Sequence, residues 1–198
     1  IKVSLLDADS GKSIGSKSFP EEEMVIQSPE KGWAEQDPET WWKYVQQATK
    51  YVLSGAAVKS KELQGIGIAY QMHGLVLVDK NQKVLRSSII WCDSRAVAIG
   101  DAAFSEMGEE YCLDHLLNSP GNFTASKLRW VIENQPELVV KIDKIMLPGD
   151  FIAMKLSGEI VTSEAGLSEG IFWDFKSNEI SQKVLNQYQI NPNWIPKT

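Results

Sequence analysis

The sequence predicts an α/β fold in which helices cover the faces of a mixed β-sheet. Three short apolar runs occupy the middle of the chain, at 63–70, 75–79 and 84–91. Segments whose apolar residues follow a helical spacing stand before and after these runs. Because short buried strands between helices are typical of a sheet packed on both faces, the pattern favours this class, and we expect one domain.

Composition agrees with a folded domain and disfavours several partners. The 198 residues are 43% hydrophobic and 23% charged, enough to bury a real core. The net charge of −6 argues against a nucleic-acid partner, and no apolar run approaches the length of a membrane span. Cys92 and Cys112 form no CxxC pair, so neither a disulfide framework nor a metal site is predicted, and we expect a cytoplasmic location.

Two strands are expected at the start of the chain. Residues 1–19 alternate apolar and polar side chains on both sides of Asp9-Ser10-Gly11, which predicts a β-hairpin with a tight turn. The alternation already begins at Ile1, which is not an initiator Met. We therefore expect further residues upstream. The polar, proline-punctuated stretch 20–32 is interpreted as a loop.

A long helix should follow this loop. Asp37 is expected to cap it, with Pro38 at its first position and its end near Gly55. The side chains expected on its apolar face are Trp42, Val45, Thr49 and Val52.

The second half of the chain is expected to be mainly helical. Gly108 should break helices over 94–107 and 108–117, Thr124 should cap the next helix, and Pro136 should open a short one. A strand is expected at 145–147. The remaining expectations are a helix from an Asp150 cap to Leu156 ended by Gly158, and β-like pieces within 159–175.

The stretch "YQMHG", residues 70–74, ends the first apolar run, and ligands in open α/β sheets bind beyond the carboxyl ends of strands. His73 can exchange hydrogen bonds with a polyol, Met72 can pack against its C–H face, and Gly74 permits close approach. The alternative is a half-buried histidine held by a backbone carbonyl. Spacing alone favours the half-buried histidine, because a single histidine is weak evidence for a ligand site.

Two further stretches carry candidate side chains. In "IIWCDSRA", Trp91, Asp93 and Arg95 follow a strand; the alternative for the last two is a helix cap and an ion pair. Asn122 and Phe123 precede a helix N-terminus, where a polar side chain can meet a ligand hydroxyl. Their alternative is a loop asparagine in left-handed geometry beside a phenylalanine that fills the core.

Taken together, these stretches resemble a known family. The segments "GWAEQDPETWW", "GIGIAYQMHGLVLVDKNQKVLRSSIIWCDSRA" and "GNFTASKLRWVIENQPE", in this order, are similar to the N-terminal domain of the sugar kinases that include glycerol kinase and gluconate kinase. The xylulose-using members are the most similar, and "QMHG" is the most specific element.

The resemblance implies an actin-like, ribonuclease-H-like fold, in which residues 1–198 form an N-terminal domain incomplete at both ends. It implies ATP, Mg²⁺ and phosphorylation of D-xylulose, with Met72, His73 and Asn122 contacting the sugar. It also implies a phosphate-binding turn upstream of Ile1, and a general-base Asp and a C-terminal domain beyond Thr198.

Other functions stay open at this stage. The same fold can serve another pentulose or polyol, such as L-ribulose or L-xylulose. A nuclease-type module with Asp7, Asp79 and Asp93 as metal ligands, or a non-catalytic module, is disfavoured by the acidic balance. The number of subunits does not follow from the sequence, and a homodimer is kept as an open alternative.

Overall fold

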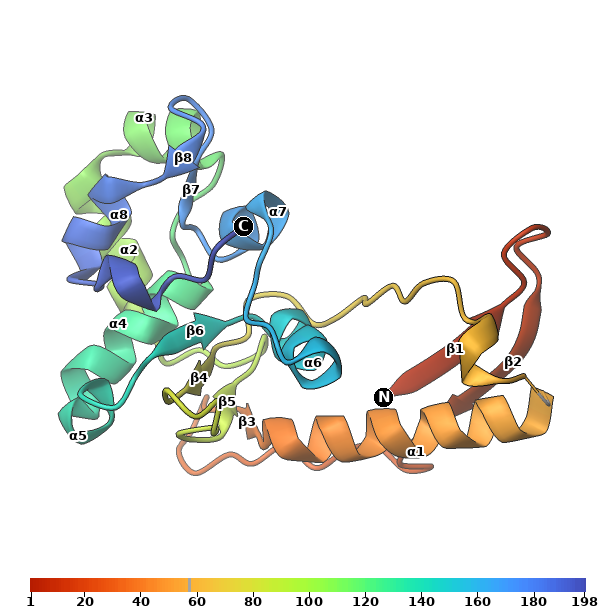
Figure 1. Cartoon of the computed structure of the whole chain (residues 1–198). Coiled ribbons are helices and arrows are strands. Elements are labelled where there is room, and N and C mark those ends of the chain that lie inside the picture. The colour runs from red at the N-terminus through yellow and green to blue at the C-terminus, as the bar shows by residue number, and fades with distance from the viewer. Residues whose placement is uncertain (57) are drawn as a thin grey trace.

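The computed structural model describes residues 1–56 and 58–198 and confirms the α/β class (Figure 1). Its strands are β1 Lys2–Leu6, β2 Ser13–Ser18, β3 Glu35–Gln36, β4 Val76–Val78, β5 Ser88–Ile89, β6 Lys144–Met146, β7 Trp173–Asp174 and β8 Glu179–Ile180. Its α-helices are α1 Pro38–Ala56, α2 Val97–Met107, α3 Glu109–Tyr111, α4 Thr124–Asn134, α5 Pro136–Val139, α6 Pro148–Ser157, α7 Glu164–Glu169 and α8 Gln182–Tyr188. A π-helical turn, Cys112–Leu116, continues α3, and 3₁₀ turns span Ser60–Glu62 and Pro192–Trp194.

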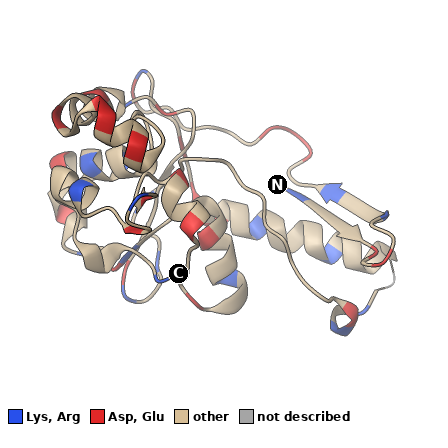
Figure 2. Cartoon of the chain, turned by 90° about the horizontal axis from the view of Figure 1, so that it is seen from above, with Lys and Arg blue, Asp and Glu red and all other residues tan. Residues whose placement is uncertain are grey.

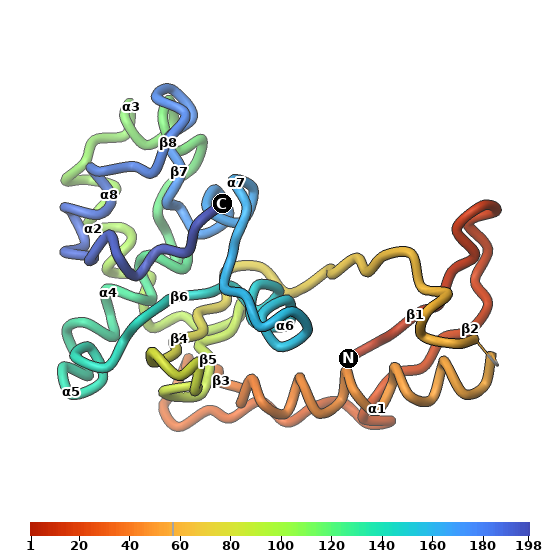
Figure 3. The backbone as a smooth tube through the Cα atoms, in the orientation of Figure 1, coloured from red at the N-terminus to blue at the C-terminus, as the bar shows by residue number. Residues whose placement is uncertain are grey.

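The strands of the described residues pair two by two and antiparallel: β1 with β2, β3 with β5, β4 with β6, and β7 with β8. A bridge between Leu75 and Ile89 links the β3–β5 pair to the β4–β6 pair. This central group of strands lies between two sets of helices (Figure 1). The hairpin β1–β2 lies apart from it, against the far end of α1, as the backbone trace shows (Figure 3).

The alternation of side chains along β4 explains the layers. Leu77 packs into a core with helices α2, α4 and α8, whereas Val76 and Val78 pack into a second core with Trp41 and Phe151. Because successive side chains of a strand point to opposite faces, β4 contributes to both cores, and so does β6, through Ile145 and Met146. All three residues of β4 are fully buried, which is why the sequence shows a continuous apolar run here.

Residues 63–70 do not form the predicted strand. This stretch runs as extended chain between the 3₁₀ turn and β4 (Figure 3), and no strand of the described residues pairs with it. Ile66, Ile68 and Tyr70 are exposed. An apolar run favours extended backbone, but a strand also needs the hydrogen bonds of a neighbour.

Helix α1 forms as expected at both ends. The Asp37 carboxylate accepts a hydrogen bond of 2.9 Å from the Glu39 main-chain nitrogen, so it caps the helix. The apolar face is rotated by about one residue from the expected one. Val52 is fully buried as predicted, but Trp41 and Ala48 take the central positions, while Trp42, Val45 and Thr49 are half-buried.

Three predictions for the second half need correction. Thr124 is the first residue of α4, not its cap, because its hydroxyl points to the Gly74 carbonyl, 3.4 Å away. Asp150 lies in the first turn of α6 and accepts from the Leu147 nitrogen at 3.2 Å. Residues 164–169, expected to be β-like, form α7, because the Ser163 hydroxyl caps the Gly166 nitrogen. Gly158 ends α6 at a φ of 80°, as predicted.

The helices of residues 1–56 and 58–198 include none that combines the length and the apolar character needed to cross a membrane.

Candidate functional site

The turn 70–74 before β4 holds His73 in an unusual backbone conformation. Its φ is 57°, in the left-handed region that side chains with a Cβ rarely adopt. Both main-chain polar groups of the residue are engaged. The nitrogen donates to Glu169 Oε1 at 2.6 Å, and the carbonyl oxygen accepts from Lys127 Nζ at 2.7 Å. Contacts from two distant helices therefore hold the strained residue in place.

The His73 ring is half-buried and oriented by two neighbours. It packs on the Phe123 ring, with centroids 4.0 Å apart, and its Nδ1 lies 3.3 Å from the Glu169 carbonyl oxygen. This is the backbone-carbonyl arrangement considered as the alternative. Burial lowers the pKa of His73, so the ring is neutral at pH 7. With the proton on Nδ1 toward the carbonyl, Nε2 carries the lone pair and can accept a hydrogen bond from a hydroxyl.

Gly74 is required by packing within the chain. A Cβ built on Gly74 would lie 2.4 Å from Cγ of Pro148, the first residue of α6. The close approach expected at this glycine is thus made by α6, and the turn and the helix fix each other's position.

Met72, in this turn, and Trp91 have 55% and 56% of their surface exposed. The two turns that carry them are joined by a hydrogen bond of 3.3 Å from the Trp91 nitrogen to Gln71 Oε1. The structure therefore brings together the ends of the first and third apolar runs singled out in the sequence.

Asn122 uses its amide within the chain. Its Nδ2 donates to the main-chain oxygen of Asp93, and its buried Oδ1 has no hydrogen-bond partner among the described residues. The left-handed backbone considered for Asn122 occurs instead at its neighbour Gly121, with a φ of 37°. Phe123 packs against the hydrophobic core, as expected, and its ring also lies against the His73 ring. The 121–123 loop and the His73 turn are thus neighbours.

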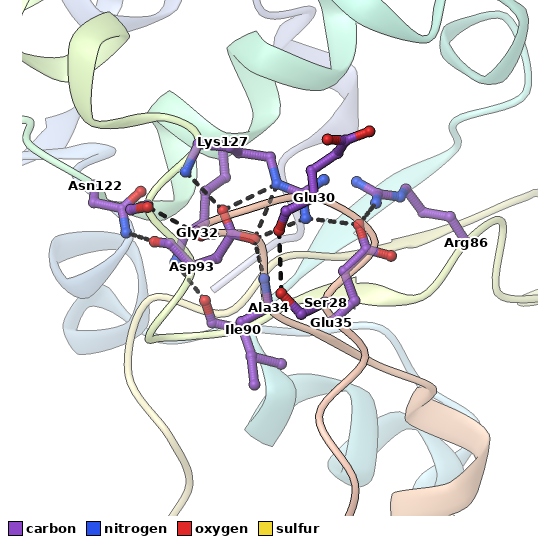
Figure 4. A network of polar contacts seen from close by, with 12 residues as sticks. Ser28, Glu30, Gly32, Ala34, Glu35, Arg86, Ile90, Asp93, Asn122 and Lys127 are labelled. Atoms are coloured by element: carbon purple, nitrogen blue, oxygen red, sulfur yellow. Dashed lines mark hydrogen bonds and ion pairs between the residues drawn. The ribbon is translucent and has the colours of Figure 1, made fainter.

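Asp93 and Arg95 form a buried ion pair rather than an open site. Arg95 Nη2 lies 2.7 Å from Asp93 Oδ2, and also 2.7 Å from Glu35 Oε1. Figure 4 labels the two acidic residues, Asp93 and Glu35. The Arg95 guanidinium lies over Trp33 and Trp130, at 3.9 and 4.7 Å from the ring centroids. The ion pair considered as the alternative is confirmed, although helix α2 begins only at Val97, so Asp93 is not its cap.

Lys127 is a residue of this site that the sequence reasoning missed. It is fully buried, and its Nζ donates to the carbonyl oxygens of His73 at 2.7 Å and Ile90 at 3.0 Å. Burial lowers its pKa to about 8. A signal was available: Thr124, Lys127, Leu128 and Val131 stand at i, i+3, i+4 and i+7, so the lysine lies on the apolar face of its helix.

A cluster of acids lies behind the His73 turn. Burial raises the pKa of Glu169 and of the Tyr70 hydroxyl that bonds to it. Burial also raises the pKa of Asp150 to about 6, although the Leu147 nitrogen and the Thr162 hydroxyl donate to its carboxylate. These carboxylates support the turn from inside the protein.

The structure does not bring the three candidate metal ligands together. Asp7 accepts from Ser10 in the hairpin turn, Asp79 accepts from Asn81 and Lys83, and Asp93 is paired with Arg95. Across residues 1–56 and 58–198, no group of three His, Cys, Asp or Glu side chains is placed to hold a metal ion. Each of the three carboxylates is held by a contact within its own part of the chain.

Comparison with known proteins gives consistent results. Xylulose kinase of Escherichia coli K12 is 30% identical over 196 residues, which are 99% of this chain and 39% of that relative. The crystal structure of xylulose kinase from Rhodospirillum rubrum has a TM-score of 0.84 at 26% identity, covering 98% of this chain and 39% of that one. The chain thus spans about two fifths of the length of these proteins.

The likeness extends to more distant sugar kinases. The structure of Plasmodium falciparum glycerol kinase with ADP superposes with a TM-score of 0.87 at 20% identity, covering 99% of this chain and 40% of that one. These neighbours confirm the predicted actin-like fold class. The model of the FGGY family of carbohydrate kinases, N-terminal domain, matches residues 1–198. The chain therefore belongs to the FGGY family of carbohydrate kinases.

Proposed function

We propose that the whole protein transfers the γ-phosphoryl group of ATP to the terminal hydroxyl of D-xylulose, giving D-xylulose 5-phosphate. The observation that carries the proposal is the His73 turn. It presents a neutral imidazole beside an exposed methionine at the end of an extended segment, in a chain similar to xylulose kinases over nearly all its length.

Met72, His73 and Asn122 contact the sugar in this proposal. Nε2 of His73 accepts a hydrogen bond from a sugar hydroxyl, and the Met72 thioether packs against the carbon chain. For Asn122 the contacting atom is Oδ1, since Nδ2 is engaged by the Asp93 main-chain oxygen. Oδ1 is buried and has no partner among the described residues, so this contact requires the Asn122 side chain to turn toward the sugar.

ATP and Mg²⁺ are the proposed co-substrate and metal. The described residues offer no three-ligand metal group, so no step that involves the metal is assigned to them. We place the general-base Asp beyond Thr198 and the phosphate-binding turn upstream of Ile1. In this proposal residues 1–198 form an N-terminal domain. Phosphoryl transfer depends mostly on positioning and charge stabilisation, so separate domains can supply the sugar contacts and the phosphate contacts.

A cytoplasmic location and the absence of a nucleic-acid partner complete the proposal. Cys92 and Cys112 are both free thiols, as suits a reducing compartment. Acidic and basic residues are interspersed along the ribbon (Figure 2), whereas nucleic-acid binders gather their basic residues on one face. The homodimer remains an open alternative, to be decided by light scattering.

The test is ATP consumption by the full-length protein with D-xylulose, L-ribulose, L-xylulose, glycerol and gluconate. We expect D-xylulose to give the highest kcat/KM. His73→Ala should lower this value by a factor of about ten or more, the loss of roughly one hydrogen bond. His115→Gln, which changes the other histidine, is the control. A higher kcat/KM with another substrate overturns the choice of sugar, and unchanged kinetics in His73→Ala overturns the role of His73.

A further inference from the structure

We propose that Lys127 is a positioning residue for the sugar: its ammonium group fixes the His73 turn to the end of the third apolar run at Ile90, and thereby fixes the direction of the His73 ring. The consequence for sugar binding rests on the proposed function. The positioning of His73 by Lys127 is inferred from the contacts alone.

The two acceptors of Lys127 belong to different parts of the chain. The His73 carbonyl lies in the turn before β4, and the Ile90 carbonyl lies just after β5. Figure 4 shows the side chain extending from α4 toward the end of β5. One ammonium group therefore joins a helix to the two turns that carry Met72, His73 and Trp91.

The burial of Lys127 is not explained by packing alone. None of its side-chain surface is exposed, and taking an ammonium group out of water is costly. An apolar side chain of the same length would fill the space without that cost. What the lysine adds is a pair of directed hydrogen bonds to two carbonyl groups of different turns. The Ile90 carbonyl also accepts from the Asp93 main-chain nitrogen at 3.2 Å.

Lys127 and Glu169 hold His73 from its two sides. Glu169 accepts a hydrogen bond from the main-chain nitrogen of His73, and Lys127 donates one to its carbonyl oxygen. Both peptide planes that flank His73 are therefore fixed. These planes determine the left-handed backbone, and the backbone determines where the imidazole points. Removal of the ammonium group releases one of the two planes.

The first experiment separates positioning from general stability in the full-length enzyme. We expect Lys127→Met to raise KM for D-xylulose about tenfold, the loss of roughly one hydrogen bond, while KM for ATP stays unchanged. Lys141→Met, the same substitution at an exposed lysine, should leave both constants unchanged. Equal increases in KM for sugar and ATP, or no increase in either, would overturn the proposal.

A double-mutant cycle tests whether Lys127 acts through His73. In a His73→Ala background the positioned ring is absent, so Lys127→Met should change KM for the sugar by less than about twofold. A full tenfold effect in that background would show that Lys127 acts on sugar binding by another route, which overturns the assignment.

A third measurement does not depend on enzyme activity. The ring signals of His73 and His115 are recorded by NMR in full-length protein with labelled histidine, assigned with His73→Ala and His115→Gln. Lys127→Met should shift the His73 signal and leave that of His115, which bonds to Asp174, in place. If no sugar is phosphorylated, the proposed function fails, but the shift of the His73 signal still tests whether Lys127 positions His73. A His73 signal that does not shift in Lys127→Met overturns the positioning role of Lys127.

Discussion

The carboxylate of Glu169 accepts a hydrogen bond of 2.6 Å from the main-chain nitrogen of His73, although the two residues are 96 positions apart in the chain. Glu169 is the last residue of α7, in the stretch expected from the sequence to be β-like. The helical conformation is what places its side chain under the His73 turn. The His73 turn thus depends on a short helix from the other half of the chain.

Replacement of this carboxylate should destabilise the protein. Glu169→Ala removes the acceptor of the His73 nitrogen, and we expect the free energy of unfolding to fall by about 1–2 kcal/mol. Glu169→Gln keeps an acceptor oxygen and should lose less. Urea unfolding with unchanged m-values measures both. A Gln variant as unstable as the Ala variant would contradict this explanation.

The raised pKa of Asp150 predicts a pH effect on stability. Because burial raises this pKa from 3.8 to about 6, the folded state holds the proton more tightly than the unfolded state. The stabilisation by the proton is complete below about pH 4 and is lost as the pH rises through about 6. Wild-type stability relative to Asp150→Asn should therefore fall over this range, by at most about 3 kcal/mol.

The measurement for Asp150 is urea unfolding of both proteins at several pH values between 4 and 8. The difference between them, not either curve alone, isolates this carboxyl from the others. Asp101→Asn, at an exposed position of α2, is the control substitution. A difference that stays constant from pH 4 to pH 7 would contradict the prediction.

The buried ion pair between Asp93 and Arg95 predicts a large effect of a single deletion. Asp93→Ala leaves the buried guanidinium without this partner, and we expect a loss of about 3–5 kcal/mol. Adding Arg95→Met should recover part of the loss, because the uncompensated charge is then removed. Thermal and urea unfolding of the two variants give the comparison, and purely additive losses would be inconsistent with coupling.

Two glycines should respond to alanine in opposite directions. A Cβ on Gly100 in α2 would lie 1.7 Å from the Gly121 main-chain oxygen, so Gly100→Ala must displace the 121–123 loop and should cost about 1–3 kcal/mol or more. A Cβ on Gly55 in α1 meets nothing within 4 Å, so Gly55→Ala should stabilise by about 0.4–1 kcal/mol. The difference in melting temperature between the two variants checks both signs.

The elements that the sequence predicted well are those with local signals. The hairpin turn at Asp9-Ser10-Gly11, the Asp37 cap and the Gly158 stop each act within a few residues, and each is found in the structure. The strand expected at 63–70 failed because pairing depends on a neighbour that local spacing does not specify. The helix at 164–169 was missed because the Ser163 cap was overlooked in a stretch rich in small residues.

The residues of the candidate site differ in the same way: local signals identify some of them, and long-range packing determines the others. The position of His73 after an apolar run was enough to single it out, but its supporting partners were not predictable from neighbouring residues. Lys127 and Glu169 are separated from His73 by 54 and 96 positions. Only the packing of α4 and α7 against the turn reveals them, although the helical spacing around Lys127 already indicated that this lysine would be buried.

The left-handed backbone of His73 also limits how this protein can be engineered. A library at position 73 changes side-chain chemistry and backbone energy together, because valine, isoleucine and threonine are strongly disfavoured at a φ near 57° whereas asparagine, aspartate and glycine tolerate it. Attempts to alter ligand preference should therefore draw on those tolerant residues first. A screen that scores activity alone would otherwise reject side chains with suitable chemistry because they destabilise the left-handed backbone at position 73.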